Sequence, residues 1–191
     1  MEADWEIEIG GESPVIEAHW QGFVDLRLHP ERASKLREAA ALPAFAEALQ
    51  ALNAETSPVW TSKCDVWPIF DSAEIDLNEL DAPAGCDAHA VGGYVDLFPR
   101  DEHKWDLPAT AAADCKHLCN LLRAVPLRCC RVDLVIRQAI LDSANLTDGS
   151  MSLAMTAYLT ACGPTNAEAA TAFQAALAEF ARVLSARSTL E

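Results

Sequence analysis

The pattern of apolar and polar positions at the start of the chain predicts two strands. Residues 5–9 alternate between apolar and acidic side chains, which is typical of a strand with one solvent-facing side. A Gly-Gly-Glu-Ser-Pro run at 10–14 has the composition of a turn. A second strand, bent near Gly22, is therefore expected over residues 15–28, paired with the first as a hairpin.

The rest of the chain continues this alternation of strand and helix patterns. Pro43 interrupts the first helical stretch, so we expect two segments or a kink there. Thr165 and Glu168 form a capping box that predicts the beginning of the last helix. The predicted strands lie at 59–69, 91–98, 128–140 and 151–162, and the predicted helices at 30–53, 107–125 and 166–185.

This order predicts a single α+β domain over residues 1–191. The elements follow one another as ββα-ββα-ββα, which contains the β-α-β-β-α-β order of a ferredoxin-like core. We expect a sheet of about six strands, mostly antiparallel, with the helices on one face. The other face of the sheet, called the open face below, is then left to water, to a partner or to another subunit.

A short phrase recurs along the chain and places acids on this open face. The run at 22–26, Gly-Phe-Val-Asp-Leu, reappears at 93–97 as Gly-Tyr-Val-Asp-Leu, and a Val-Asp-Leu run at 132–134 matches its core. Because strand side chains alternate between faces, each aspartate points away from its apolar neighbours. We therefore expect Asp25, Asp96 and Asp133 on the open face, with Val24, Leu26, Val95, Leu97, Val132 and Leu134 beneath the helices.

The open face is the candidate binding site. Aromatic side chains among charged ones offer a large contact area with few rotatable bonds, as in protein interfaces. The residues expected to form this binding face are Phe23, Asp25, Arg27, Tyr94, Asp96, Arg131 and Asp133.

The aspartates of this face permit two other interpretations. Carboxylates held close together bind Mg²⁺ or Mn²⁺, so Asp25, Asp96 and Asp133 are candidate ligands for metal-dependent phosphoryl-transfer or phosphodiester chemistry. Arg27 and Arg131 each lie two positions from an aspartate, which instead favours structural ion pairs on a solvent-facing sheet. No other cofactor is expected.

Charge narrows the choice of partners. The chain has 51% hydrophobic and 23% charged residues and a net charge of -15, which is the composition of an acidic globular protein. This charge opposes binding to phosphate backbones and to anionic membranes, so neither nucleic acid nor a membrane is expected as a partner. A loop at 71–87 concentrates acids and contains no Lys or Arg, and it is expected to be solvated, to cover the open face or to dock a basic partner.

The seven cysteines are expected to be thiols of a cytoplasmic protein, because the first residues lack the features of a signal peptide. Cys115 and Cys119 share a helical face with leucines, so we expect them in the core. Cys129 lies beside Arg128 and Arg131, an arrangement that predicts a lowered thiol pKa.

The sequence therefore favours a non-catalytic binding, regulatory or assembly module that uses its open face, with a protein partner or a second copy of the chain as a homodimer. The alternative is the divalent-metal enzyme described above, so the sequence leaves the question of catalysis open. The phosphate-binding loop, the G-x-S-x-G elbow and the H-E-x-x-H helix are all absent from the sequence.

Overall fold

The computed structural model describes residues 1–10, 14–17, 22–70, 75–101, 103–141 and 152–186. Within these ranges, six strands and four α-helices, with one 3-10 helix called η1, follow one another in the predicted ββα-ββα-ββα order. Their bounds are β1 Glu2–Glu8, β2 Val15–Glu17, η1 Pro30–Lys35, α1 Arg37–Ala41, α2 Pro43–Asn53, β3 Val59–Ile69, β4 His89–Pro99, α3 Pro108–Arg123, β5 Cys130–Leu141, β6 Ser152–Gly163 and α4 Asn166–Ala186.

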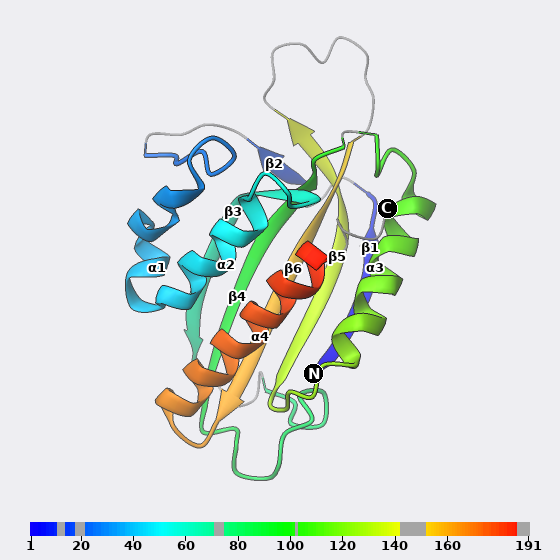
Figure 1. Ribbon diagram of the computed structural model, residues 1–191. Helices are drawn as coiled ribbons and strands as arrows, with labels where there is room; N and C mark the ends of the chain where they lie inside the picture. Colours follow the sequence, from blue (N-terminus) through cyan, green and yellow to red (C-terminus); the bar gives the residue numbers. More distant parts are fainter. Residues whose placement is uncertain (11–13, 18–21, 71–74, 102, 142–151, 187–191) are drawn as a thin grey trace.

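The strands form one mixed sheet in the order β1-β5-β6-β4-β3 (Figure 1). The pairs β3–β4, β4–β6 and β5–β6 are antiparallel, whereas β1 and β2 both run parallel to β5. Because β1 and β2 share this one position, the sheet is five strands wide. The α+β class is confirmed, but a ferredoxin-like core and a sheet of six positions are not. The predicted hairpin between the first two strands is not formed. Strands β1 and β2 instead follow one another along β5 as one interrupted edge strand.

The long second strand expected over residues 15–28 is also wrong. Strand β2 covers Val15–Glu17, residues 18–21 lie outside the described residues, and residues 22–28 contain turns and no strand. Asp25 accepts a hydrogen bond from the backbone N–H of Arg27 at 2.9 Å, and its own carbonyl accepts one from His29 at 3.2 Å. Local hydrogen bonds of this kind compete with strand pairing, so the first copy of the repeated phrase is a turn although its sequence alternates. The bend expected near Gly22 coincides with a positive φ of 92°.

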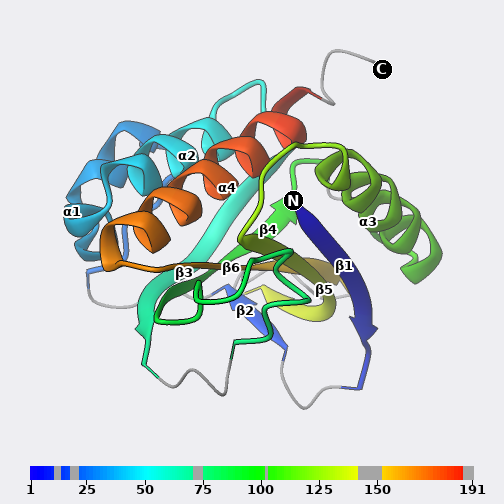
Figure 2. The same ribbon diagram turned by 90° about the horizontal axis from the view of Figure 1, so that it is seen from below.

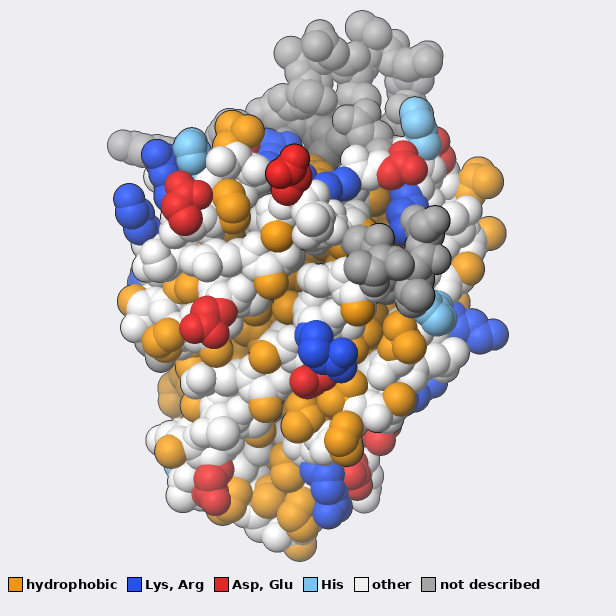
Figure 3. Space-filling model, in the orientation of Figure 1, with side chains coloured by type: hydrophobic (Ala, Val, Ile, Leu, Met, Phe, Trp, Pro, Cys, Tyr) orange, Lys and Arg blue, Asp and Glu red, His pale blue; other side chains and the backbone are white. Residues whose placement is uncertain are grey.

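The other predicted strands and helices are present in the structure, and the helices lie on one face of the sheet. Helices α2, α4 and α3 lie side by side on the sheet, with α4 in the middle (Figures 1 and 2). The capping box begins α4, where the Thr165 hydroxyl accepts a hydrogen bond from the Glu168 N–H at 3.2 Å. On the helix side, charged side chains lie scattered among hydrophobic ones (Figure 3). None of the described helices combines the length and apolar character needed to cross a membrane.

The side chains of β4 and β5 alternate between the helix-covered face and the open face as predicted. Val95, Leu97, Val132 and Leu134 are fully buried beneath the helices. Val24 and Leu26 join the same core, although they reach it from the turn and not from a strand.

Two connections cover the ends of the open face. At one end, the Trp60 ring stacks on Phe98 at 4.4 Å, and the Arg27 guanidinium lies over Trp60 at 4.4 Å. At the other end, the described part of the acidic loop lies on the side of the sheet away from the helices (Figure 2), where Leu80 and Cys86 cluster with Cys162. The middle of the open face remains between these two covers.

Two glycines allow close packing on both sides of β4. A Cβ at Gly93 would lie 2.8 Å from the Phe173 ring of α4 and 2.9 Å from the Asp65 carbonyl oxygen of β3. A Cβ at Gly92, on the opposite face, would lie 3.0 Å from the Trp67 ring. Strand β4 therefore needs glycine at position 93, where a Cβ would meet backbone as well as a ring, whereas at position 92 the partly exposed Trp67 ring would have to shift slightly.

The outer edge of β3 is protected against pairing with another strand. The Val66 N–H donates to the Asp65 carboxylate at 2.8 Å, and Pro68 has no N–H. In an antiparallel pair, alternate residues direct their N–H groups to the same side, so both positions belong to the outer edge. The loss of free donors at these two positions makes this part of the edge a poorer template for aggregation.

We expect Gly93→Ala to lower the free energy of unfolding by about 1–3 kcal/mol, because the added methyl group overpacks a rigid contact. Urea unfolding measures this change. Gly10→Ala is the matched control, since a Cβ there meets nothing within 4 Å. Equal stability of the two variants would contradict the close approach of Phe173.

We expect the double variant Asp65→Ala/Pro68→Val to self-associate more strongly than the wild type, because it frees two outward N–H groups. Light scattering against protein concentration measures this change. The control, Glu55→Ala/Pro126→Val, makes the same chemical changes at exposed positions away from the edge. If the edge variant and the control associate to the same extent, the lost charge and not the freed N–H groups causes the association, and the prediction is contradicted.

Candidate functional site

The structure divides the seven predicted binding residues among three places. Tyr94 and Asp96 lie on β4, and Arg131 and Asp133 on β5, all with their side chains on the open face. Phe23, Asp25 and Arg27 lie in the turn that follows β2 and not on a strand. Phe23 and Tyr94 nevertheless line the same cavity.

Asp25 and Arg27 form a local ion pair. The Arg27 Nη2 atom lies 2.8 Å from Asp25 Oδ2, and its Nε donates to Oδ1 at 3.0 Å. The guanidinium covers Trp60 at the same time. This pair therefore helps the turn to close one end of the open face.

Asp96 is a buried carboxylate in the middle of the open face. Its side chain is 6% exposed, and Oδ1 accepts a hydrogen bond from the Thr156 hydroxyl at 2.7 Å. Burial raises the pKa of Asp96, while Thr156, Lys63 and Arg137 offset part of this increase. Beside it, burial and the Asp96 charge raise the pKa of Tyr94 to about 12, so the phenol is a hydrogen-bond donor at neutral pH.

The arginines of β5 are engaged in ion pairs, as the structural interpretation of the sequence expected. Arg131 Nη2 lies 2.7 Å from Asp133 Oδ1, and Arg131 Nη1 lies 3.2 Å from Glu79 of the acidic loop. Arg137 donates to Glu8 at 2.8 Å and to the Tyr158 hydroxyl at 2.8 Å. Burial raises the pKa of Asp133, and its pairing with Arg131 offsets part of this. A hollow of about 340 Å³ beside β1 is lined by Arg131, Asp133, Arg137 and Tyr158, among others.

The geometry does not favour the metal hypothesis. Asp96 pairs with Thr156 and Asp133 with Tyr158, so β6 separates the two carboxylates by about 10 Å of sheet. Asp25 is held by Arg27 in the turn. Among the described residues, no group of three His, Cys, Asp or Glu side chains is arranged to hold a metal ion. No step of a reaction is therefore derived through a metal.

Sequence reasoning identified Tyr94 but not the row of aromatic rings to which it belongs on the open face. Trp67, Tyr94 and Tyr158 come from β3, β4 and β6, with centroid distances of 6.3 Å and 6.1 Å between neighbours. Arg137 extends the row, with its guanidinium 5.5 Å from the Tyr158 ring centroid. The alternation of side chains along β3 and β6 could have placed Trp67 and Tyr158 on the open face. Only the order of the strands in the sheet makes the three rings neighbours.

The thiol of Cys129 is less acidic than the sequence predicted. Burial and the neighbouring Cys86 thiol raise the pKa of Cys129, and the smaller effect of Arg128 does not reverse this. The predicted lowered pKa is therefore wrong. Cys115 and Cys119 lie in the core as expected. Burial raises the pKa of Cys64 to about 12, so this thiol is protonated at neutral pH.

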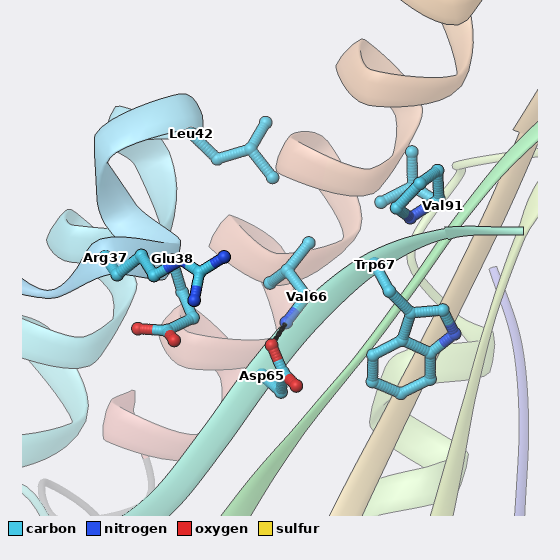
Figure 4. A pocket seen from close by; sticks show the side chains of 8 residues that line it. Arg37, Glu38, Leu42, Asp65, Val66, Trp67 and Val91 are labelled. Carbon is cyan, nitrogen blue, oxygen red and sulfur yellow. Dashed lines mark hydrogen bonds between the residues drawn. The ribbon is translucent and has the colours of Figure 1, made fainter.

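Two adjoining cavities follow the outer edge of β3. The first, of about 430 Å³, lies between Leu42, Val66 and Val91, with Trp67 at its end (Figure 4). Arg37 and Glu38 extend into it from the beginning of α1 (Figure 4). The same two residues also line the second cavity, of about 520 Å³, which is bounded by the turn at 22–26. The edge of β3 is thus flanked by a groove with apolar walls and a few charged groups.

We expect Asp96→Asn to stabilise the protein at neutral pH. A raised pKa means that the folded state binds the proton more tightly than the unfolded chain. Folding therefore loses stability as pH rises from 3.8, the ordinary value for aspartate, through the raised value. Asparagine does not ionise and still accepts the Thr156 hydrogen bond.

The test is urea unfolding of wild type and variant between acidic and neutral pH. The advantage of Asp96→Asn should shrink as pH falls towards 3.8. Glu55→Gln, at an exposed position, is the control and should show no such trend. A variant that is less stable at every pH would show that the charge of Asp96 stabilises the fold.

A comparison of the chain with protein-family models, curated proteins and solved structures finds no match.

Proposed function

We propose that this protein is a non-catalytic binding or assembly module that works through the middle of its open face. The row of Trp67, Tyr94 and Tyr158 is the observation that carries the proposal. Trp67 is 39% exposed and lies against the backbone of Gly92, so its ring presents a flat surface outwards. Rigid aromatic rings at the centre of a surface are typical anchors of protein interfaces.

The charged groups around the row support binding and not catalysis. Arg131 with Asp133 and Arg137 with Glu8 are mutually neutralised pairs. A nucleophile or general base needs a poised protonation state near neutral pH, whereas the thiol of Cys64 and the phenol of Tyr94 are held protonated. Pairs of this kind are suited to form the polar rim of an interface.

The negative charge around the aromatic row favours a basic protein as the partner. Exposed acids border the row on both sides, at Asp4 and Glu6 of β1 and at Asp65 of β3, in a chain of net charge -15. A protein surface with Lys or Arg around an apolar side chain complements this face. A second copy of the chain would bring the same negative charge, so a different, basic protein is the partner that we propose. Nucleic acid and anionic membranes are disfavoured for the same reason, and we propose a cytoplasmic setting.

The test is a titration with two matched peptides, one alternating Lys and Leu and the other Glu and Leu, followed by NMR. We expect the Lys-Leu peptide to shift the Trp67 indole N–H and the Tyr94 signals. Trp67→Ala should weaken this binding by at least about tenfold, since an interface anchor contributes about 2 kcal/mol or more.

Leu107→Ala is the matched control, because Leu107 is a large apolar side chain, 64% exposed, just before α3. It should leave the affinity unchanged. Equal responses to both peptides, or equal losses in both variants, would contradict a specific cation-selective face. Light scattering of the wild type at rising concentration tests the homodimer, which would replace the basic partner if it forms through Trp67.

A further inference from the structure

The larger cavity beside β3 has features of a second binding site, which shares Tyr94 with the aromatic row of the open face but not Trp67 or Tyr158. Its volume of about 520 Å³ lies within the range of small-molecule sites. Its walls come from the turn at 22–26, from residues 35–38 and from the part of β3 at 62–64, with Tyr94 of β4. Segments far apart in the sequence therefore enclose it.

The cavity is locally basic in an acidic protein. Lys35, Arg37 and Lys63 line it, which is three of the 14 Lys and Arg residues of the chain. Most other described basic side chains pair with carboxylates, as Arg131 and Arg182 do. Within the described ranges, neither Lys35 nor Arg37 has an ion pair. Their charges are thus available to a ligand.

The charge balance favours a ligand with a single negative charge. Glu38 lines the cavity, and Asp96 lies close enough to Lys63 for their charges to interact. The residues that line the cavity, Lys35, Arg37, Lys63 and Glu38, carry an excess of positive charge. Asp96 and Asp65, whose charges act on the lining residues Tyr94 and Cys64, offset part of this excess. A carboxylate suits this balance better than a polyphosphate, and the planar fork of Arg37 matches its geometry.

A buried hydroxyl of this wall lacks a partner. The ladder between β3 and β4 is interrupted between Thr61 and Cys64, so that Ser62 and Lys63 together stand opposite Asp96. The Ser62 Oγ atom is buried and has no hydrogen-bond partner in the described part of the chain. A buried polar group without a partner costs about 1–3 kcal/mol, and bulges of this kind often adjoin functional sites. Because Ser62 also lines the cavity, a rotation of its side chain would turn this hydroxyl towards a ligand oxygen that accepts its hydrogen bond.

The remaining walls define the body of the ligand. Phe23 and Tyr94 contribute aromatic rings, and Val24, Leu26 and Leu36 contribute aliphatic groups. Arg37 also borders the adjoining cavity with its apolar wall of Leu42, Val66 and Val91 (Figure 4), which leaves room for a longer body. These surfaces fit a ring or a short alkyl chain.

We infer that this cavity binds a small organic monoanion, a carboxylate carried on an aromatic or aliphatic body. Arg37, Lys35 and Lys63 hold the carboxylate, and Ser62 donates a hydrogen bond to it. Phe23 and Tyr94 contact the body.

Three probes of one shape and different charge test this inference: benzoate, neutral benzamide and cationic benzamidine, titrated at constant ionic strength and followed by NMR. We expect benzoate to bind at least about tenfold more tightly than benzamide, and to shift the amides of Arg37, Ser62 and Lys63. This factor corresponds to about 1.4 kcal/mol. Equal affinity for the three probes, preference for benzamidine, or no shift with benzoate overturns the inference.

Arg37→Gln and Ser62→Ala should each weaken benzoate binding about fivefold or more and leave benzamide binding less affected. Arg32→Gln is the control, because Arg32 is exposed in the preceding helix and lies outside the cavity lining. A loss of the same size in Arg32→Gln would show a general effect of surface charge and overturn the site. Trp67→Ala, which removes the anchor of the open face, should retain benzoate binding, so the two proposals fail independently.

Discussion

The packing of α4 against the middle of the sheet is the contact on which the other features depend. Phe173 reaches the backbone of β4 because residue 93 has no side chain. This approach places α4 between α2 and α3 and buries the apolar side chains of β4 and β6 beneath them. The same strands must then direct their remaining side chains to the open face, since strand residues alternate. The helix layer and the candidate binding face are therefore two consequences of one alternation.

The open face shows how a polar surface is kept ordered without becoming a catalytic site. Arg131 and Arg137 each pair with a carboxylate of β5 or β1, and Asp96 is fixed by Thr156. Arg137 also donates a hydrogen bond to the Tyr158 hydroxyl, which helps to fix the orientation of that ring. A preorganised surface loses little conformational entropy on binding, which suits a recognition module.

The outer edge of β3 disfavours pairing with another strand but leaves side chains accessible to a ligand. Asp65 and Pro68 remove outward donors, so another strand gains little by pairing there. The cavities beside this edge instead present side chains, among them Arg37 and Trp67. Recognition at this edge therefore depends on side-chain chemistry and not on backbone pairing.

Sequence patterns alone determined most of the elements and which side chains of β4 and β5 face the helices, because local periodicity and capping are properties of consecutive residues. The strand order, the turn at 22–28 and the neighbours of each open-face residue were decided by tertiary structure. Asp25 shows the reason, since its repeated phrase alternates like a strand but its carboxylate closes a local turn with Arg27. Trp67, Tyr94 and Tyr158 show it again, because only the pairing of three strands makes them one row. Periodicity specifies the face on which a side chain lies, whereas long-range pairing specifies its neighbours.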